Sequence, residues 1–346
     1  TTSMIGLALG QIFFGPLSDK YGRRPLLLVS MLLFIVSTLF CLFAPDIYSF
    51  VTLRLIQGIA GAGGIVISRS VAIDKFSGKE LAKMLAVIGA INGVAPVAAP
   101  VIGGLLTGSV GWQGIFMILL FIGILLGIGC IRFKESLPAE KRSKTGVWAT
   151  FRSFGIIVHN RRYMLYVFQL AFAQGILFAY IASSPFIIQQ HYGFSPFAFS
   201  ICFAVNAVAI GVAAALSVKF RRTENGTLTG CVGMLVFAVL QMAALYSGCG
   251  FWTYELLMFA LLFMMGLTFT ASTTLAMDCE RRYAGAASAL LGALCFASGG
   301  IVSPLVGLGD ILISTGVTFV ICAVCSLLCA LWAVKRTGPK VALCRI

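Results

Sequence analysis

Polar side chains inside long apolar stretches are the first candidates for chemistry in this sequence. They are Arg54, Gln57, Asn92, Gln174 and Asn206. An arginine in such surroundings is costly and marks a functional position by default, although Arg54 is close enough to one end of its stretch to reach water. The amides could bind a polar ligand or hydrogen-bond one helix to another. These residue types indicate binding and positioning rather than bond-breaking chemistry.

The sequence lacks the residues that several classes of reaction require. The sequence has no G-x-x-x-x-G-K-[ST] loop for nucleotide phosphates and no H-E-x-x-H zinc pair. Its two histidines, His159 and His191, lie between the apolar stretches, whereas cysteines such as Cys322, Cys325 and Cys329 lie inside them. Cysteines in such places behave as small apolar residues. We therefore expect no metal site, no cofactor and no enzymatic activity.

The composition identifies the solvent that the surface must face. The chain has 346 residues, of which 60% are hydrophobic and 10% are charged, whereas a soluble domain carries about 25% charged residues. The apolar stretches are too long and too continuous for barrel strands, and residues 26–44 can cross a bilayer as a helix. We predict an all-α membrane protein with transmembrane helices at residues 2–18, 26–44, 47–73, 82–107, 112–133, 163–190, 196–219, 227–248, 251–277, 284–308 and 311–334.

The basic residues support these spans and give an orientation. Of the 25 lysines and arginines, 23 lie in every second loop, and the remaining two, Arg54 and Arg69, lie inside the third span. By the positive-inside rule the basic side is cytoplasmic, and the C-terminus lies on that side. A net charge of +14 can indicate a nucleic-acid partner. We exclude that partner because the charges are scattered over short loops.

A weak internal repeat suggests two bundles. LSDKY at residues 17–21 recurs as LSVKF at 216–220, and PVIG at 100–103 recurs as PLVG at 304–307. Parallel repeats of this kind build transporters that rock around a midplane site. We predict an N-terminal bundle at 1–133, a cytoplasmic linker at 134–162 and a C-terminal bundle at 163–346. The linker reads either as an amphipathic surface helix, from the spacing of Trp148, Phe151, Phe154, Ile157 and Val158, or as a plain connection.

The segment GPLSDKYGRRP at residues 15–25 reads as a tight charged turn. It resembles the signature loop of the major facilitator superfamily at nearly every position. The resemblance implies a pseudo-symmetric fold of two helical bundles and a conformational latch. In this latch Asp19 would dock on the start of the helix near Ala284, and Arg23 would pair with Asp74. The other latch residues would be Gly15, Gly22 and Arg24.

Two further segments resemble motifs of the same superfamily. RLIQGIAG at residues 54–61 resembles its second motif, and APVIGG at 99–104 resembles the antiporter motif of drug/proton exporters. The expected glycines are replaced by alanine at Ala86, Ala95 and Ala99, which keeps the helix surface small. The second resemblance favours export and implies close helix packing at Pro100, Gly103 and Gly104.

Four other segments resemble the Bcr/CflA branch of bicyclomycin- and chloramphenicol-resistance exporters. They are SSPF at 183–186, YGFS at 192–195, FAVN at 203–206 and AGAASALLG at 284–292. The resemblance implies proton-coupled efflux of small drugs or metabolites by alternating access in a bacterial inner membrane. Arg54, Gln57, Asn92, Gln174 and Asn206 would then line the transport path. The implied partners are a small-molecule substrate, protons and the lipid bilayer, and we expect a monomer.

The resemblance also implies twelve helices, of which about eleven are present. The first, which carries an acidic residue in this branch, would precede Thr1. Asp46, Glu255 and Asp310 are placed near the outer surface by the spans, so no acidic residue is predicted deep within the membrane. Two alternatives stay open: an importer of a small metabolite with the same fold, and an inactive truncated membrane fragment.

Overall fold

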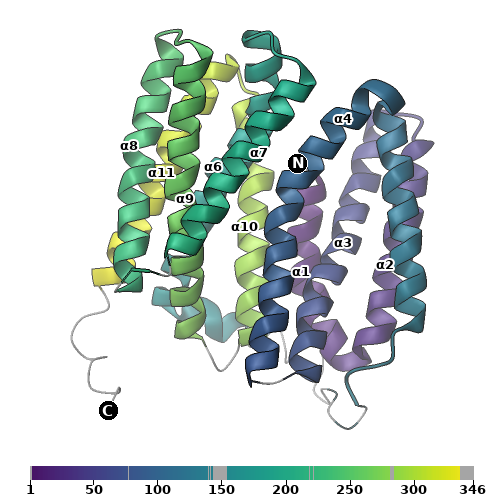
Figure 1. Ribbon diagram of the computed structural model, residues 1–346. Helices are drawn as coiled ribbons and strands as arrows, with labels where there is room; N and C mark the ends of the chain where they lie inside the picture. Colours follow the sequence, from purple (N-terminus) through teal and green to yellow (C-terminus); the bar gives the residue numbers. More distant parts are fainter. Residues whose placement is uncertain are drawn as a thin grey trace. The chain divides into compact units, whose positions relative to one another are not determined.

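The computed structural model of the chain describes the backbone of residues 2–76, 78–138, 140, 142, 154–217, 219–220, 222–280 and 284–335, with only some of the side chains within 78–109 and 284–285. Regular structure in these residues is helical (Figure 1). The helices are α1 (Thr2–Tyr21), α2 (Arg23–Leu42), α3 (Ile47–Lys75), α4 (Gly78–Arg132), α6 (Arg161–Pro185), η2 (Phe186–His191), α7 (Pro196–Ser217), α8 (Thr223–Tyr246), α9 (Phe251–Cys279), α10 (Ala284–Val306) and α11 (Ile311–Lys335).

Every predicted span overlaps one or two of these helices along most of its length, so the predicted all-α membrane fold is confirmed. The spans at 82–107 and 112–133 form the two arms of α4, which turns at Gly111, where φ is +65°. The span at 163–190 comprises α6 and the π-helical turn η2, which begins after Pro185. Within the described residues, nine helices are long and apolar enough to cross a membrane.

Residue contacts divide the chain into two units. The first contains residues 1–155 together with 285–300, and the second contains 156–284 together with 301–346. Helix α10 is therefore shared between them. In the linker, residues 154–159 form a short helical segment in which Phe154 and Ile157 are buried, whereas Trp148 and Phe151 lie outside the described residues. The amphipathic surface helix and the predicted bundle boundaries stay predictions.

In the first unit, α3 packs against both α1 and α2. The contact between α1 and α3 is close because glycines replace side chains on both helices. A Cβ on Gly6 would lie 2.3 Å from the Leu55 carbonyl oxygen, and a Cβ on Gly58 would lie 2.2 Å from the Ser3 carbonyl oxygen. Transmembrane helices associate through such small residues, since burial from lipid supplies no hydrophobic driving force.

Replacing Gly58 with alanine is expected to lower the free energy of unfolding by about 1–3 kcal/mol, because the new methyl group must push two backbones apart. Thermal unfolding of the purified protein in detergent measures the effect. Gly64→Ala is the control, since its Cβ would lie 3.8 Å from the Met31 methyl carbon, at ordinary van der Waals distance. Equal unfolding temperatures for the two variants would contradict the close contact at Gly58.

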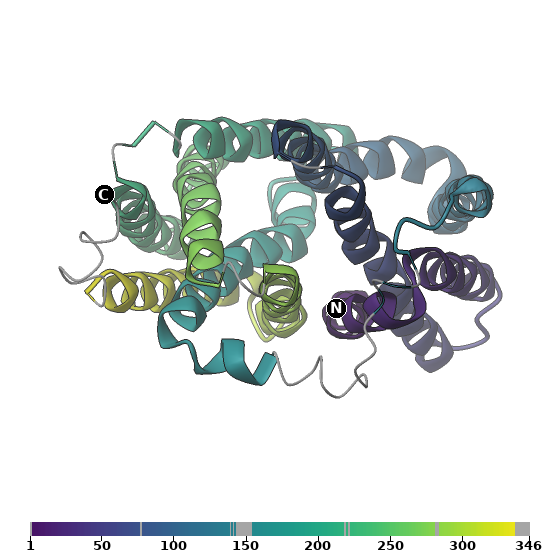
Figure 2. The ribbon, with the colours of Figure 1, turned by 90° about the horizontal axis from the view of Figure 1, so that it is seen from below.

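The second unit repeats this packing. Helix α9 packs against α7 and α8, as α3 does against α1 and α2, and it also contacts α6 (Figure 2). A Cβ on Gly266 of α9 would lie 2.5 Å from the Ile210 carbonyl oxygen of α7. The unit is held by a core of buried apolar residues that includes Ile176, Met258 and Phe319. The similar packing of the two helix trios supports the internal repeat.

Candidate functional site

The turn between α1 and α2 has the tight geometry that its sequence indicates. Gly22, the only residue between the helices, has φ of +102°, a conformation that favours glycine. Its N–H donates to the Ser18 carbonyl at 3.1 Å. A Cβ at Gly22 would also lie 2.5 Å from a carboxylate oxygen of Glu135. The backbone angle therefore requires glycine here, and a Cβ would also displace the Glu135 carboxylate.

Arg23 forms the centre of a charged cluster at this turn. Its Nε donates to Asp74 Oδ2 at 2.9 Å, and its Nη1 donates to Asp19 Oδ1 at 2.5 Å. The same Nη1 donates to Ser18 Oγ at 2.7 Å. The Arg23 side chain is only 7% exposed, and that of Asp74 is 15% exposed. The pair implied by the resemblance thus joins the start of α2 to the end of α3, and Asp19 adds the end of α1 to the cluster.

Glu135, which the sequence analysis did not single out, also belongs to this cluster. It accepts hydrogen bonds from the backbone N–H groups of Arg23, Arg24, Ser136 and Leu137, at 3.0 to 3.1 Å. Burial raises the pKa of the Glu135 carboxyl, but these backbone donors outweigh burial and hold the pKa below its ordinary 4.5. The carboxylate caps the first turn of α2 from a distant segment of the chain.

The remaining latch residues have smaller roles in the geometry. Arg24 is exposed and donates from Nη2 to the Ile131 carbonyl at 3.0 Å. Gly15 faces α3, where its Cβ would lie 3.8 Å from Val66. Docking of Asp19 near Ala284 stays a prediction, because Ala284 belongs to the second unit.

Arg54 and Gln57 form a second polar group, at the interface of α2 and α3. Nη1 of Arg54 donates to the Gln57 side-chain oxygen, and Gln57 Nε2 donates to Thr38 Oγ1 at 2.6 Å. The Arg54 guanidinium also lies over the Phe116 ring, 5.4 Å from its centroid. Gln57 and Thr38 are buried. This geometry favours the helix-tying interpretation for Gln57.

The structure describes the surroundings of the other predicted site residues only in part. Asn92, Pro100 and Gly104 lie on α4, but their side chains or surroundings fall outside what the structure describes. Among the described atoms, a Cβ on Gly103 would meet nothing within 4 Å, so the expected close packing finds no support there. Gln174 is half-buried on α6.

Asn206 joins three helices of the second unit. Its Nδ2 donates to the Tyr180 hydroxyl oxygen on α6 at 3.0 Å and to Glu255 Oε1 on α9 at 2.8 Å. Asn206 and Tyr180 are buried, and Glu255 is half-buried. The predicted spans place Glu255 near the outer surface. The hydrogen bond to Asn206 shows that its carboxyl group points into the helix interface, and its depth in the membrane stays a prediction.

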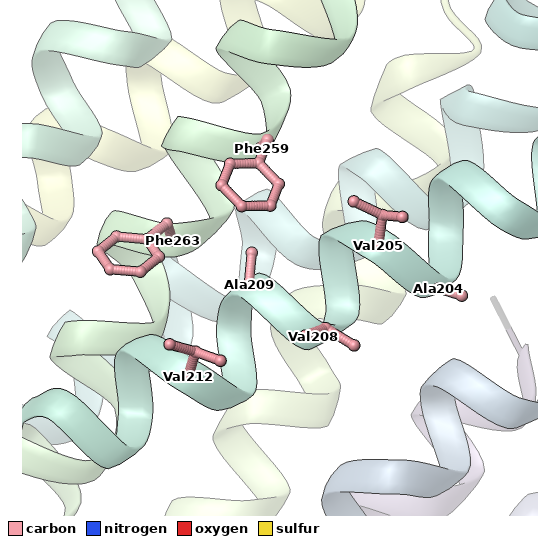
Figure 3. Close-up of a pocket in the computed structure, with 7 residues that line it drawn as sticks. All are labelled: Ala204, Val205, Val208, Ala209, Val212, Phe259 and Phe263. Atoms are coloured by element: carbon pink, nitrogen blue, oxygen red, sulfur yellow. The ribbon is translucent and has the colours of Figure 1, made fainter.

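An apolar groove lies beside this group, between α7 and α9. It has a volume of about 330 Å³. Figure 3 shows Phe259 and Phe263 extending from α9 toward the side of α7 that carries Val205 and Ala209. The groove is lined by Ala204, Val205, Val208, Ala209, Val212, Phe259 and Phe263. Its lining suits an apolar molecule, and Glu255 precedes the lining residue Phe259 by one turn of α9.

Comparison with known proteins decides the family. The sequence profile described as "Major Facilitator Superfamily" matches residues 1–304. The chain belongs to the major facilitator superfamily. It is 38% identical over 317 residues to the uncharacterized MFS-type transporter YdgK of Bacillus subtilis, covering 90% of this chain and 79% of that one. It is 29% identical over 320 residues to a bicyclomycin resistance protein homolog of Haemophilus influenzae, covering 88% and 78%.

Solved structures of the superfamily share the fold. The xylose transporter XylE from E. coli, in a partially occluded inward open conformation, aligns with a TM-score of 0.73 at 15% identity, covering 96% of this chain and 85% of that one. A bacterial homolog of the human lysosomal transporter Spinster aligns with a TM-score of 0.70 at 17% identity, covering 97% and 90%. The protein is therefore a multi-pass membrane transporter of this superfamily, which is not a family of enzymes.

Proposed function

We propose that the protein exports small, largely apolar compounds across a bacterial inner membrane in exchange for protons, by alternating access. The observation that carries the proposal is the groove between α7 and α9, whose lining residues are all apolar. Ligand sites are concave and mostly apolar, with a few polar groups that fix orientation. Two kinds of relative add support: the bicyclomycin resistance protein homolog, and the multidrug resistance protein MdtL of Salmonella heidelberg at 25% identity.

The Arg23 cluster would act as the latch of the transport cycle. It is built from charges at the ends of three helices, so a change in helix position would break or remake it. A buried ion cluster that can form in only one arrangement biases a two-state equilibrium toward that state. We further propose that Arg54, Gln57, Asn92, Gln174 and Asn206 belong to the transport path or to its supporting hydrogen bonds, and that the protein acts as a monomer with its C-terminus in the cytoplasm.

The direction of transport rests on a separate feature. The segment APVIGG at residues 99–104 resembles the antiporter motif of drug/proton exporters and favours export over import. An importer with the same fold would take up its substrate together with protons that move down their own gradient. An inactive fragment would move substrate in neither direction.

Reconstituted vesicles test these alternatives together. A pH gradient is imposed, a panel of apolar drugs is added, and proton flux and drug flux are both recorded. We expect drug-stimulated proton release that depends on the gradient. Proton and substrate movement in the same direction would identify an importer, and the absence of both fluxes would identify an inactive chain.

The groove itself is tested by filling it. Replacing Val205 with tryptophan places an indole opposite Phe259 and is expected to weaken binding of an apolar substrate about tenfold, equivalent to roughly 1.4 kcal/mol. Equilibrium binding to the purified protein measures the change. Val236→Trp on α8 is the matched control, since Val236 is 50% exposed, Val205 is 47% exposed, and Val236 lies outside the groove. Equal affinities for the two variants would argue against substrate binding at this groove.

A further inference from the structure

The hydrogen bond of Glu255 reaches the middle of a transmembrane helix. Its partner Asn206 is ten residues after the start of α7 at Pro196, or about 15 Å along the helix axis at 1.5 Å per residue. Tyr180, the other partner of Asn206, is only 1% exposed. The Glu255 carboxyl therefore lies in the interface of α6, α7 and α9, although its backbone is only one turn inside α9.

No cation faces this carboxyl among the described residues. The titratable groups that interact with it are the phenols of Tyr180 and Tyr254 and the thiol of Cys202. Tyr192 of η2 lies beside Tyr254. Helix α8 also packs against α9, and its described titratable groups lie elsewhere: Glu224 in the first turn, Cys231 against Gln169, and the exposed Tyr246. A carboxyl inside a membrane protein without a cation marks proton transfer or ligand binding.

The hydrogen-bonding atoms around Glu255 suit both the ionised and the protonated form of its carboxyl. The ionised carboxyl accepts from Asn206 Nδ2 through Oε1. Three buried atoms next to it have no partner in the described part of the chain: Glu255 Oε2, Asn206 Oδ1 and the Tyr254 hydroxyl. A protonated carboxyl supplies an O–H donor, and Asn206 Oδ1 is an acceptor on the same amide. Buried polar atoms are rarely left unpaired unless they have a role.

The carboxyl and the groove are adjacent on both helices. Phe259, which lines the groove, follows Glu255 by four residues and therefore shares its face of α9. On α7, Ala209 of the groove follows Asn206 by three residues and therefore shares its face. A substrate in the groove would thus lie about one helical turn from the carboxyl along α9.

We propose that Glu255 is the residue that carries the exchanged proton, with Asn206 and Tyr180 as positioning residues. This inference rests on the proposed exporter function and names its coupling group. In one cycle the Glu255 carboxylate takes one proton from the outer side, and substrate arriving in the groove from the inner side displaces that proton toward the cytoplasm. Charge and proton number balance, since the same carboxylate is restored.

The test compares Glu255→Gln with Asp310→Asn in vesicles. Glutamine keeps an acceptor for Asn206 but cannot release a proton. Asp310 is an exposed acid that caps α11 through the N–H groups of Leu312 and Ile313, and asparagine is an equally good cap. We expect Glu255→Gln to lose gradient-driven drug accumulation and drug-stimulated proton release, while drug counterflow without a gradient persists. Asp310→Asn is expected to keep all three.

The outcomes separate the inference from the function on which it rests. If the wild-type protein shows no gradient-driven transport, the exporter function fails. If the wild type is driven and Glu255→Gln releases protons equally well, the inference fails and the exporter stands. Loss of counterflow in a folded Glu255→Gln protein would likewise overturn it, because the carboxyl would then serve binding alone.

A second measurement does not depend on the folding of a variant. Dicyclohexylcarbodiimide modifies protonated carboxyls in apolar surroundings, so in the wild-type protein it should label the peptide that contains Glu255. Mass spectrometry of the digested protein measures the labelling. We expect labelling to decrease as the pH rises and when an apolar drug is bound. Failure to label Glu255 at acidic pH, or labelling that the drug leaves unchanged, would contradict the proposal.

Discussion

Replacing Arg23 with alanine should reduce transport about a hundredfold, since losing about 3 kcal/mol of stabilisation shifts a two-state equilibrium by that factor. The side chain is 7% exposed and holds both Asp19 and Asp74. Removing one partner of a buried ion pair costs about 3–5 kcal/mol because the other charge stays buried without compensation, which here applies to Asp74, whereas Asp19 is 47% exposed and contributes less. In Arg23→Ala two carboxylates would remain close together, and the state that needs the cluster would lose most of its population.

Two variants test whether this effect comes from the geometry of Arg23. Arg23→Lys keeps the charge but loses the fixed fork with which Nε and Nη1 reach two carboxylates, so we expect intermediate transport. Lys20→Ala removes a neighbouring charge whose ammonium lies over the Tyr21 ring, and it should transport almost normally. Transport rates in vesicles and accessibility of an engineered surface cysteine report activity and conformation separately. Wild-type rates for Arg23→Ala would exclude the latch.

Replacing Glu135 with alanine should lower the free energy of unfolding by about 2–3 kcal/mol, because hydrogen bonds to charged groups each contribute about 1.5–3 kcal/mol and part of the loss is recovered through water. The first two N–H groups of α2 would lose their acceptor, and so would the N–H groups of Ser136 and Leu137, which directly follow Glu135. Glu140→Ala, which removes an exposed acid from the same segment, is the matched control. Thermal unfolding in detergent measures both.

The pH dependence of this effect has a definite sign. The pKa of Glu135 is lower in the folded protein than its ordinary 4.5. A carboxyl of this kind contributes stability above pH 4.5, and the contribution disappears as the pH falls through the lower, folded value. The difference in unfolding temperature between the wild type and Glu135→Ala should therefore be full at neutral pH and shrink in acid below pH 4.5. A difference that stays constant into acid would mean that the carboxyl acts only through packing.

Much of the fold could be predicted because its signals are local. Continuous apolar stretches locate the helices, since each residue contributes its own transfer free energy to membrane insertion. The glycine at position 22 fixes a turn through its own backbone angle. The pairing of Arg23 with Asp74 followed only from the resemblance to a family motif, because the two residues are 51 positions apart.

The parts of the candidate site that escaped prediction depend on distant segments. Glu135 accepts a hydrogen bond from the N–H group of Arg23, which is 112 residues away in the sequence. Its one visible signal was an acid in a mostly basic segment that also contains Glu140, and this signal by itself indicates no partner. From the sequence, Asn206 could either bind a polar ligand or hydrogen-bond one helix to another. Its actual partners, Tyr180 and Glu255, lie on other helices and became known only from the structure.

The sequence by itself determined that this chain crosses the membrane repeatedly and where each helix lies, because hydropathy acts residue by residue. It also determined the family, through motifs whose residues are contiguous. Only the tertiary structure decided the partner of each polar side chain. That choice depends on how each helix is rotated and how closely glycines let it approach its neighbours, and no count along a single helix contains either quantity. Glu255 shows the difference: its position in α9 indicates the surface, whereas its contact with Asn206 places the carboxyl inside.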